Sequence, residues 1–336
     1  MPSIISKLIF ACFFIIIRAD DLRENKLEKY NEILENSSRI FNGNLYKTIT
    51  GNSRIYTLAT SNYFGEFAVG FNNGSITIFD NFGRYKRSFI VVSSIEPSYL
   101  EIYGIRYFLN GDIGTTGKFG TKIFSNSGIQ KMYFDSCCHS AISVLTNGEV
   151  AYGLSSFRGG RIYIQNPSLA SPRLILSHSQ YYGDTIRSLL ALANGDLVSG
   201  SFGSADIKIW NTLDGSLKQS LLGHTRGICS LILLENDSIA SGSYDRTIRI
   251  WNINTGTAIK VIPADIGDYS FNLMSLLPSE NIAIASLDRT IKIWDKDNEI
   301  LIKTLYGHTD YVTSLAVNSN NFLVSVSLDK TIKIWN

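Results

Sequence analysis

The sequence predicts an all-β fold in which four short antiparallel strands repeat seven times. The first observation is a recurring pentapeptide, "IRIWN" at 248–252, with close copies at 207–211, 291–295 and 332–336. The second is its period, because successive copies counted at the Trp position lie 41 to 45 residues apart. The third is that no unit between the copies has a long helical period. Four strands in 40–45 residues are typical of one blade of a β-propeller.

Weaker copies of the pentapeptide extend the series toward the N-terminus. They are "ITIFD" at 76–80, "TKIFS" at 121–125 and "IYIQN" at 162–166. In chain order, the Trp position is therefore occupied by Phe79, Phe124, Gln165, Trp210, Trp251, Trp294 and Trp335. Seven copies in register predict seven blades.

Each unit divides into four β-rich segments separated by turns. In the last unit these segments are 301–305, 311–317, 322–327 and 331–335. The intervening "NSNN" and "LDK" have turn composition, and equivalent turns are marked by "NG" at 110–111, 147–148 and 194–195. All six prolines are expected outside the strands, because proline cannot donate a hydrogen bond to a sheet.

Composition limits the class of protein. The chain has 336 residues, of which 44% are hydrophobic and 18% charged, so it can bury a sizeable core. Its formal net charge of +2 gives no electrostatic footprint for nucleic acid, and we expect no nucleic-acid partner. The four cysteines lack the spacing of a disulfide framework or a zinc site.

The segment before the repeats has two parts. Residues 1–19 contain ten uncharged, mostly apolar residues, which are too few to span a bilayer as a helix. They are either a secretory signal cleaved after Ala19 or a hydrophobic tail. Residues 20–43 form a charged helical or linker segment, and residues 44–336 form the propeller. Glycosylation sequons occur at Asn36, Asn73 and Asn236.

Two units carry further residues at constant spacing. Residues 221–252 and 301–336 contain a GH pair, an apolar strand, a serine-rich segment ending in D-x-T, and the I-[KR]-I-W strand. In these motifs the chain resembles the WD40-repeat family from Leu45 to Asn336. The resemblance implies a structural hydrogen-bond network of His, Ser, Asp and Trp inside a blade. Here those residues are His224, Ser241, Asp245 and Trp251, and in the last blade His308, Ser325, Asp329 and Trp335.

The same residue types could form a hydrolytic triad. A catalytic triad needs one exposed nucleophile, an oxyanion hole and a substrate cleft. Here the set repeats and includes a tryptophan, which favours the structural interpretation. "GDIGTTGKFG" at 111–120 lacks the spacing and the following helix of a phosphate loop. "DSCCHS" at 135–140 cannot direct its Cys and His side chains to one metal from a strand. We therefore expect no enzyme activity, cofactor or metal.

The resemblance also predicts how the ring closes. It places the I-x-I-W strand third in its blade, and the outermost strand at the start of the next repeat. The blade that ends at Asn336 therefore needs an outer strand from elsewhere. Leu45–Ile49 aligns with "LIKTL" at 301–305 and is expected to pair with the C-terminal strand. Closure would join all seven blades in one domain and remove exposed sheet edges.

Several blades depart from the family pattern. Blades 1–3 replace its network residues, with Asn52 and Asn73 in blade 1, Lys118 in blade 2, and Gly159 and Gln165 in blade 3. Blade 4 keeps His178 and Trp210 but has no Asp placed in its turn. Blade 6 keeps Asp288 and Trp294 but has no GH pair. The strand register of blades 2 and 3 stays open at this point.

Function is expected to lie in binding, since a propeller is a rigid disc with loops on both faces. The resemblance implies that partners dock on the face of the GH loops. The candidate contact residues are Tyr244, Leu287, Leu328, Asn72, Tyr311, Thr313, Arg54, Tyr56, Arg187 and Tyr103. We expect a cytoplasmic scaffold or adaptor that binds proteins or peptide segments, as a monomeric propeller within a complex. The alternative is a secreted or lumenal propeller that binds an extracellular ligand.

Overall fold

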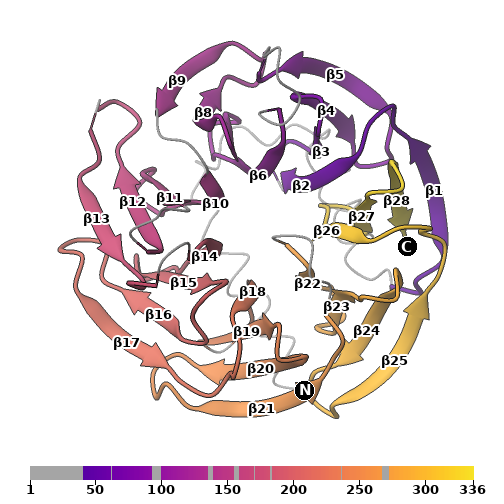
Figure 1. Ribbon diagram of the computed structural model, residues 1–336. Helices are drawn as coiled ribbons and strands as arrows, with labels where there is room; N and C mark the ends of the chain where they lie inside the picture. Colours follow the sequence, from indigo (N-terminus) through magenta and orange to yellow (C-terminus); the bar gives the residue numbers. More distant parts are fainter. Residues whose placement is uncertain are drawn as a thin grey trace, which may run out of the picture. The chain divides into compact units, whose positions relative to one another are not determined.

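The computed structural model of this protein describes residues 41–61, 63–92, 100–134, 139–154, 159–169, 171–181, 184–235, 237–266 and 272–336. In these ranges the chain forms seven four-stranded antiparallel sheets and no helix. Figure 1 shows the sheets arranged as blades around a common axis. No helix long and apolar enough to cross a membrane occurs in them. The predicted signal or tail, the charged segment up to residue 40, and sequons Asn36 and Asn236 lie outside the described residues.

The first three blades follow one another along the chain. Blade 1 contains β2 (Ile55–Ser61), β3 (Glu66–Phe71), β4 (Ser75–Asp80) and β5 (Tyr85–Ile90). Blade 2 contains β6 (Ile102–Tyr107), β7 (Ile113–Gly117), β8 (Gly120–Phe124) and β9 (Gln130–Phe134). Blade 3 contains β10 (His139–Val144), β11 (Val150–Leu154), β12 (Arg161–Gln165) and β13 (Leu174–Ser177). The register left open by the sequence is now defined, with Thr115 opposite Lys122 in blade 2 and Val150 opposite Gln165 in blade 3.

The remaining blades complete the ring. Blade 4 contains β14 (Ile186–Ala191), β15 (Leu197–Ser201), β16 (Ile207–Trp210) and β17 (Leu217–Leu221). Blade 5 contains β18 (Ile228–Leu233), β19 (Ser238–Ser243), β20 (Thr247–Asn252) and β21 (Ala258–Pro263). Blade 6 contains β22 (Met274–Leu276), β23 (Ile282–Ala285), β24 (Ile291–Asp295) and β25 (Ile300–Leu305). Blade 7 contains β26 (Val312–Val317), β27 (Leu323–Ser327) and β28 (Thr331–Trp335), together with β1 (Leu45–Thr50).

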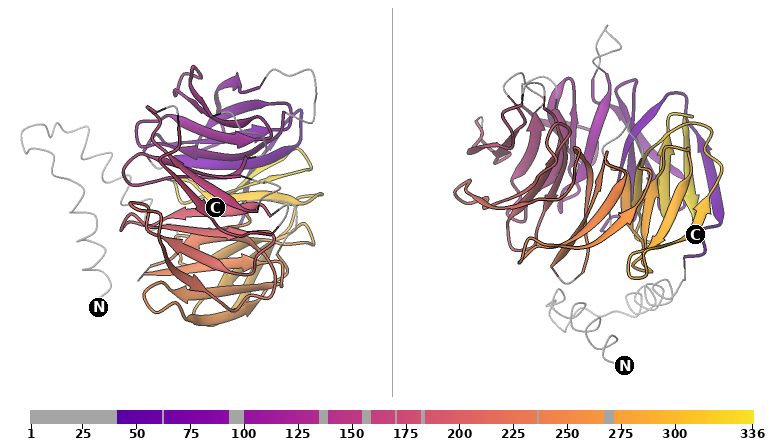
Figure 2. Two further views of the ribbon diagram at one scale, coloured as in Figure 1. Left: turned by 60° about the vertical axis from the view of Figure 1, so that its left-hand side comes forward. Right: turned by 60° about the horizontal axis from the view of Figure 1, so that its bottom comes forward.

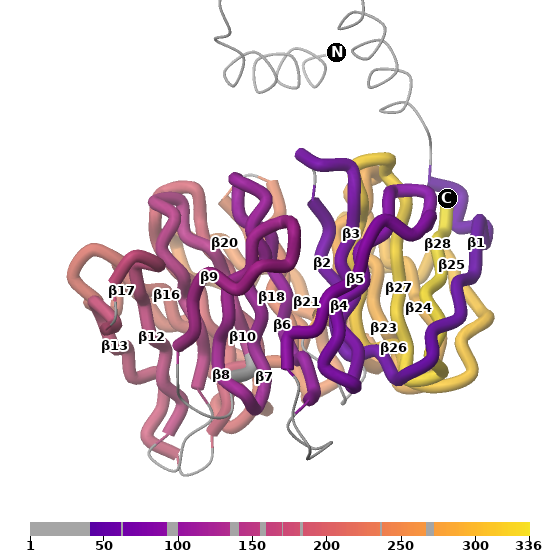
Figure 3. The backbone as a smooth tube through the Cα atoms, turned by 90° about the horizontal axis from the view of Figure 1, so that it is seen from above, coloured from indigo at the N-terminus to yellow at the C-terminus, as the bar shows by residue number. Residues whose placement is uncertain are grey.

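Closure of the ring is confirmed. Strand β1 pairs antiparallel with β28, with Leu45 opposite Trp335 and Thr50 opposite Thr331. Figures 1 and 3 show indigo β1 beside yellow β28. The amides of Asn42 and Asn44 donate to the carbonyl of Asn336 at 3.1 and 3.0 Å, so this chain crossing is also hydrogen-bonded. The N-terminal strand thus supplies the outer edge of the blade built from the C-terminal strands.

Burial falls from the inside of each blade to its rim. The second strands, such as β3 and β19, are buried along their whole length, and the third strands alternate between buried and half-buried positions. The outer strands β5 and β21 are mostly exposed. One expectation is corrected here, because Pro263 ends strand β21. It is tolerated because an outer edge strand has a side that needs no N–H donor.

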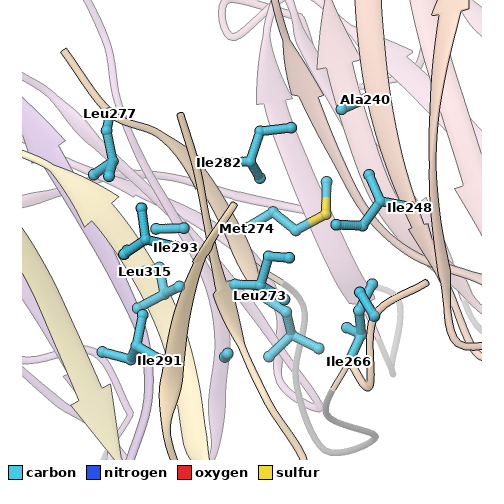
Figure 4. Packing of buried hydrophobic residues seen from close by; sticks show 14 of the residues in the cluster. Ala240, Ile248, Ile266, Leu273, Met274, Leu277, Ile282, Ile291, Ile293 and Leu315 are labelled. Carbon is cyan, nitrogen blue, oxygen red and sulfur yellow. The ribbon is translucent and has the colours of Figure 1, made fainter. Parts of the chain in front are cut away.

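The core lies between neighbouring blades. The largest hydrophobic cluster joins blades 5, 6 and 7, and Figure 4 shows Met274 of β22 between Ile282 and Ile248. Further clusters fill the spaces between the other blades, including one formed by blades 7 and 1 around Phe67 and Val324. Figure 2 shows the blades from the side as twisted sheets, a shape in which each sheet can pack on both neighbours. Every blade is therefore held on two sides, and its loops are carried on a packed frame.

Candidate functional site

In blade 5, four hydrogen-bonded side chains join the loop before β18 to the turn after β19 and to strand β20. His224 lies in the loop after β17, Ser241 lies in β19, and Asp245 lies in the turn that follows β19. The His224 ring places Nδ1 at 2.8 Å from Asp245 Oδ2 and Nε2 at 2.7 Å from Ser241 Oγ. The indole N–H of Trp251 donates to the same Ser241 oxygen at 2.7 Å. The loop before the inner strand is thus joined to the turn and to the third strand.

Blade 7 contains the same arrangement. His308 Nδ1 lies 2.9 Å from Asp329 Oδ2, and Nε2 lies 2.8 Å from Ser325 Oγ. Trp335 Nε1 donates to Ser325 at 2.9 Å. The carboxylate of Asp329 also accepts from the backbone amide of Thr309 at 2.9 Å. Two blades of nearly identical local sequence therefore reproduce one geometry almost atom for atom.

The electrostatics assign the protons in these chains. Burial lowers the pKa of His224 and of His308, against the attraction of the adjacent Asp, so both rings are neutral at pH 7. Burial alone would raise the pKa of Asp245, but hydrogen bonds from Thr247, Thr225 and His224 hold it below its ordinary value. A carboxylate can only accept, so His224 carries its proton on Nδ1, and Nε2 accepts from the Ser241 hydroxyl.

The arrangement has the properties of a structural tie. Ser241 and Ser325 have no exposed surface, and each hydroxyl oxygen is already engaged by a tryptophan and a histidine. A substrate carbonyl cannot reach such an oxygen, whereas nucleophilic attack requires contact with it. Among the described residues, no group of three or more His, Cys, Asp or Glu side chains could hold a metal ion.

Blade 4 achieves a similar tie with a residue that the sequence did not indicate. His178 Nδ1 and Trp210 Nε1 both lie 2.8 Å from Ser199 Oγ, whereas in blades 5 and 7 the histidine faces the serine with Nε2. The acid comes from the loop before β14, because Asp184 accepts from the Gly203 amide at 2.6 Å and from Ser201 Oγ at 2.8 Å. The family pattern places its Asp in the turn after the second strand, here β15. Asp184 precedes β14 instead, so a search of that turn alone misses it.

Other degenerate blades keep parts of the tie. Asn73 of blade 1 accepts from the amide of Ser75 at 3.1 Å, as Asp245 does from that of Thr247. In blade 6, Lys292 takes the place of the missing histidine, with Nζ 2.5 Å from Asp288 Oδ2 and 2.7 Å from Ser286 Oγ. Burial opposes ionisation of Asp288, but hydrogen bonds led by that of Lys292 lower its pKa to about 2.

A second repeated tie lies at the opposite end of blades 1–4. At the start of the second strand or in the turn just before it, a buried carboxylate pairs with a cation from the outer strand or the segment leading into it. The pairs are Glu66 with Lys86 and Arg87, Asp112 with Lys131, Glu149 with Arg173, and Asp196 with Lys218. The sequence carried the signal, because "NGD" or "NGE" occurs in blades 2, 3 and 4. At the aligned position blades 5–7 have Ser238, Asn281 and Phe322, and blades 5 and 7 carry the complete His–Asp tie instead.

The GH loops and the turns between second and third strands share one face of the propeller. We call it the GH face and define it by loops 222–227 and 306–311 and turns 244–246, 287–289 and 328–330. Of the ten candidate contact residues, Arg54 is exposed and eight are half-buried, namely Tyr56, Asn72, Tyr103, Arg187, Tyr244, Leu287, Tyr311 and Leu328. These nine lie at the loops and turns of this face or at the starts of the inner strands beside them.

Thr313 requires a correction. It has no exposed surface, and its hydroxyl lies 2.8 Å from the carbonyl oxygen of Ile55 and 3.2 Å from that of Val326. This side chain therefore joins blade 7 to blade 1 and cannot contact a partner. The spacing from the GH histidine placed it on an inner strand, but spacing cannot tell whether a strand residue faces a neighbouring blade or the solvent.

Aromatic and cationic side chains gather on the GH face. The Arg187 guanidinium lies 5.3 Å from the centre of the Phe202 ring, and that ring meets Tyr244 edge-on at 5.2 Å. Arg289 lies similarly over Tyr311 at 5.9 Å. Phe202 is 51% exposed and was missed, although it follows Ser201 of β15 as Tyr244 follows Ser243 of β19. Sequence comparison of the two blades could have found it.

A second group of candidate residues meets around one carboxylate. The rings of Tyr56 and Tyr103 lie edge to face at 6.4 Å, and their hydroxyls point to Glu101 at 3.5 and 2.6 Å. Lys118, the residue near the missing Asp of blade 2, forms an ion pair with Glu101 at 3.3 Å. This group links blades 1 and 2 on the GH face.

Three turn tips of the GH face present cations. Arg246, Arg289 and Lys330 each follow the aspartate of their turn and have φ of +66°, +71° and +68°. This left-handed conformation is uncommon for residues other than glycine, and it is adopted at the same position in three blades. It follows that exposed positive charge is repeated around blades 5, 6 and 7 on this face.

Seven four-stranded blades with buried polar ties define a β-propeller built from repeats. The family model "WD domain, G-beta repeat" matches residues 215–252 and 299–336, which include the two complete ties. These two blades are therefore WD40 repeats, and the chain is similar to WD-repeat proteins.

Three curated relatives match parts of the chain. WD repeat-containing protein pop2 of Schizosaccharomyces pombe is 38% identical over 177 residues, 43% of this chain and 25% of its own length. COMPASS component SWD3 of Saccharomyces cerevisiae is 39% identical over 80 residues, 23% of this chain and 25% of its own. Ribosome biogenesis protein YTM1 of Vanderwaltozyma polyspora is 27% identical over 153 residues, 45% of this chain and 27% of its own. The matches thus span about a quarter of each relative.

Proposed function

We propose that this protein is a non-catalytic interaction scaffold that docks a segment of a partner protein on the GH face. The observation that carries the proposal is the row Arg187, Phe202 and Tyr244, which crosses from blade 4 to blade 5. Arginine and aromatic side chains dominate the energetically important positions of protein interfaces. A row of such side chains in mutual contact, partly open to solvent, offers a preformed surface to an incoming chain.

The frame beneath the row supports the same proposal. Tyr244 precedes Asp245, whose carboxylate is held by His224 at 2.8 Å and by the amide of Thr247 at 2.9 Å. The turn that presents Tyr244 is therefore ordered before any partner arrives. Ordering contact residues in advance reduces the entropy lost on binding, so it favours affinity.

The names of the relatives favour a protein partner. One relative is named as a COMPASS component and another as a ribosome biogenesis protein. From these names we take only that this propeller acts together with other macromolecules. In our proposal the partner is a protein or peptide, nucleic acid is not bound, the propeller is monomeric within a complex, and the compartment is the cytoplasm.

The compartment can be tested at Asn73. This sequon residue is exposed in the turn between β3 and β4, where a glycosyl transferase could reach it. A cytoplasmic protein should show no mass change on glycosidase treatment of material from its native source. A change that disappears in an Asn73→Gln variant would instead favour the secreted or lumenal propeller.

The docking proposal is tested by comparing two sets of variants in cross-linking and affinity capture. Phe202→Ala with Tyr244→Ala removes the row, whereas Tyr85→Ala removes an aromatic ring of similar exposure from the outer strand β5. We expect specific partners to be lost with the first variant and kept with the second. All variants must retain the thermal unfolding midpoint of the parent protein within a few degrees.

The opposite outcome is equally informative. Partners that are retained by the Phe202 and Tyr244 variant, yet lost when residues of another surface are changed, would place docking elsewhere and overturn the proposal. Adding Tyr311→Ala tests whether the binding surface extends to blade 7, where Arg289 covers that ring.

A further inference from the structure

The inner strands that line the central channel have an unusual charge content. Strands β2, β6, β10, β14, β18, β22 and β26 together contain no Asp or Glu. They contain two arginines, Arg106 of β6 and Arg187 of β14, and one histidine, His139. Arg187 is stacked on Phe202 at the GH face. Arg106 is the charge that lies within the channel wall and requires an explanation.

Arg106 reaches across the channel without meeting a carboxylate. One terminal nitrogen donates to the carbonyl of Ile105 at 2.9 Å, and the other to Asn272 Oδ1 of blade 6 at 3.2 Å. Among the described residues, no carboxylate oxygen lies within the 4.0 Å of an ion pair with it. Arg106 is half-buried in the channel wall, and desolvation there lowers its pKa. A partly desolvated charge of this kind is stabilised when an anion pairs with it.

Glu66 of blade 1 and Glu101, which precedes β6, already have cationic partners. Glu66 accepts from Lys86 at 2.6 Å and from Arg87 at 2.8 Å, and the Tyr107 hydroxyl also points to it. Glu101 is held by Tyr103 and by Lys118. Neither carboxylate is therefore available to neutralise Arg106, and a counter-ion has to come from outside these groups.

A cavity opens next to the guanidinium. Its volume is about 760 Å³, and it lies at the C-terminal ends of the inner strands, away from the GH face. Its walls include the apolar side chains of Leu190, Leu233, Leu276 and Val317, and Arg106 and Asn272 line it as well. Both residues also line a much smaller space that Arg187 borders. The guanidinium therefore lies between the two spaces and forms the floor of the larger one.

We propose that this cavity binds a small amphipathic carboxylate, whose head group pairs with Arg106 and whose apolar body contacts the leucine wall. The volume is that of a small-molecule site, and the lining combines apolar side chains with polar ones, which include Asn272, Asn318 and Ser319 beside Arg106. A carboxylate matches the planar fork of a guanidinium in two parallel hydrogen bonds. One guanidinium also balances one negative charge, which favours a monoanion. The site is separate from the GH face and goes beyond the docking function.

Calorimetric titration with two probes of equal chain length tests the proposal. Octanoate carries the carboxylate, and 1-octanol has the same apolar body without the charge. We expect octanoate to bind at least about tenfold more tightly, because a hydrogen bond between charged groups in a buried site is much stronger than a neutral one. Equal affinities, or the absence of binding at millimolar octanoate, would overturn the proposal.

Variants separate this site from unspecific binding. Arg106→Met keeps the apolar stem and removes the charge, and we expect it to lose the preference for octanoate over octanol. Leu233→Glu adds a negative charge at a wall position that is 43% exposed, so the fold should tolerate it while octanoate is repelled. Arg84→Met, which removes an exposed arginine outside the cavity, is the matched control and should bind as the parent does.

The location is read from methionine methyl signals in nuclear magnetic resonance. The chain has three methionines, of which Met274 lies in the cavity wall and Met132 lies at another depression between blades 2 and 3. Octanoate should shift the Met274 signal and leave Met132 unchanged, and the reverse would refute the assigned place. A trileucine peptide and its C-terminal amide distinguish the source, since binding of the free peptide but not of octanoate would overturn the small-molecule occupant.

Discussion

Ser241 illustrates how one hydroxyl can hold three segments of chain together. Its oxygen accepts from the indole of Trp251, and its proton is directed to His224, which in turn donates to Asp245. Each group would be buried without a partner if its neighbour were removed. The cost of a deletion is therefore set by the partners that remain and not by the bond that is lost.

Replacing Ser241 with alanine should reduce stability by about 1–3 kcal/mol, because the Trp251 indole and His224 Nε2 are left unpaired. Chemical unfolding followed by tryptophan fluorescence measures the change. Ser216→Ala, in an exposed turn, is the matched control and should change stability by less than about 0.5 kcal/mol. In the Trp251→Phe background the effect of Ser241→Ala should be smaller, and full additivity would argue against the network.

His178 should make the protein sensitive to acid. It is completely buried, and burial together with the nearby Lys208 lowers its pKa to about 4. Below pH 6.5 the unfolded chain binds a proton that the folded chain does not, so stability falls as the pH is lowered from 6.5 to 4. The loss is up to about 3 kcal/mol for this shift. Unfolding free energies measured across this range should show it.

Two variants separate titration from hydrogen bonding at this position. His178→Asn removes one titrating ring and should reduce the pH dependence between pH 6.5 and 4, leaving the part that His224 and His308 contribute. Ser199→Ala removes the hydroxyl bonded to the ring, so it should lower stability but leave the slope with pH in place. Identical slopes in the parent and the His178 variant would contradict the assignment.

At the scale of elements, the blades are tied at two different ends. Blades 5 and 7 have the complete His–Asp tie at the GH face, and blades 1–4 have buried carboxylate–cation pairs at the start of the second strand or in the turn just before it. Both devices connect the inner part of a blade to its outer part. The blades that look degenerate by the family pattern are thus held by other means.

Glu66→Gln should be strongly destabilising, by about 3 kcal/mol, because it leaves Lys86 and Arg87 without their buried partner. The Glu66 side chain is 1% exposed, and hydrogen bonds from Arg87 and Lys86 outweigh burial and lower its pKa. The matched control is Glu280→Gln in the corresponding turn of blade 6, where the side chain is 35% exposed and pairs with Lys296 at 3.4 Å. Thermal unfolding compares them, and equal midpoints would contradict the role of the pair.

At the scale of the whole molecule, closure depends on one strand pair. Strand β1 is separated from β28 by the entire propeller sequence, and the two meet with Thr48 opposite Lys333. The Lys333 ammonium donates to Thr48 Oγ1 at 3.1 Å, so these side chains already touch. Because forming this contact orders the longest loop in the molecule, closure carries the largest entropy cost of any strand pairing here.

A disulfide between Thr48→Cys and Lys333→Cys should therefore stabilise the ring, by about 5 to 6 kcal/mol in the chain-entropy account of a loop this long. Unfolding of the oxidised and reduced forms of the same variant provides the comparison, with mass spectrometry to verify the bond. Thr48→Cys with Lys333→Ser controls for the loss of the lysine contact. If oxidation leaves the midpoint unchanged, β1 would not be the point at which the ring opens.

The repeat made the fold accessible from sequence. The I-[KR]-I-W strand recurs in register, and one period contains enough turns for four strands, so the blade number could be derived. Closure and the complete ties of blades 5 and 7 followed from the resemblance to the WD40-repeat family, carried over to residues such as Asp245 and Asp329 that occupy identical places in their units. Local periodicity determines local strand order, because each blade is formed by residues close together in the chain.

What the tertiary structure decided concerns contacts between blades. Thr313 is buried because it faces blade 1. Asp184 accepts hydrogen bonds from Ser201 and Gly203, which lie 17 and 19 residues further along the chain. Phe202 contacts Arg187 and Tyr244, and Arg106 donates to Asn272 on the far side of the channel. Most of these neighbours come from different blades and meet only when the blades assemble into the ring. The spacing within a single repeat does not encode which side chains meet between blades. The sequence thus determined the seven blades and, through the family resemblance, their internal ties. The assembled ring determined which side chains lie together on the surface proposed for docking and around Arg106.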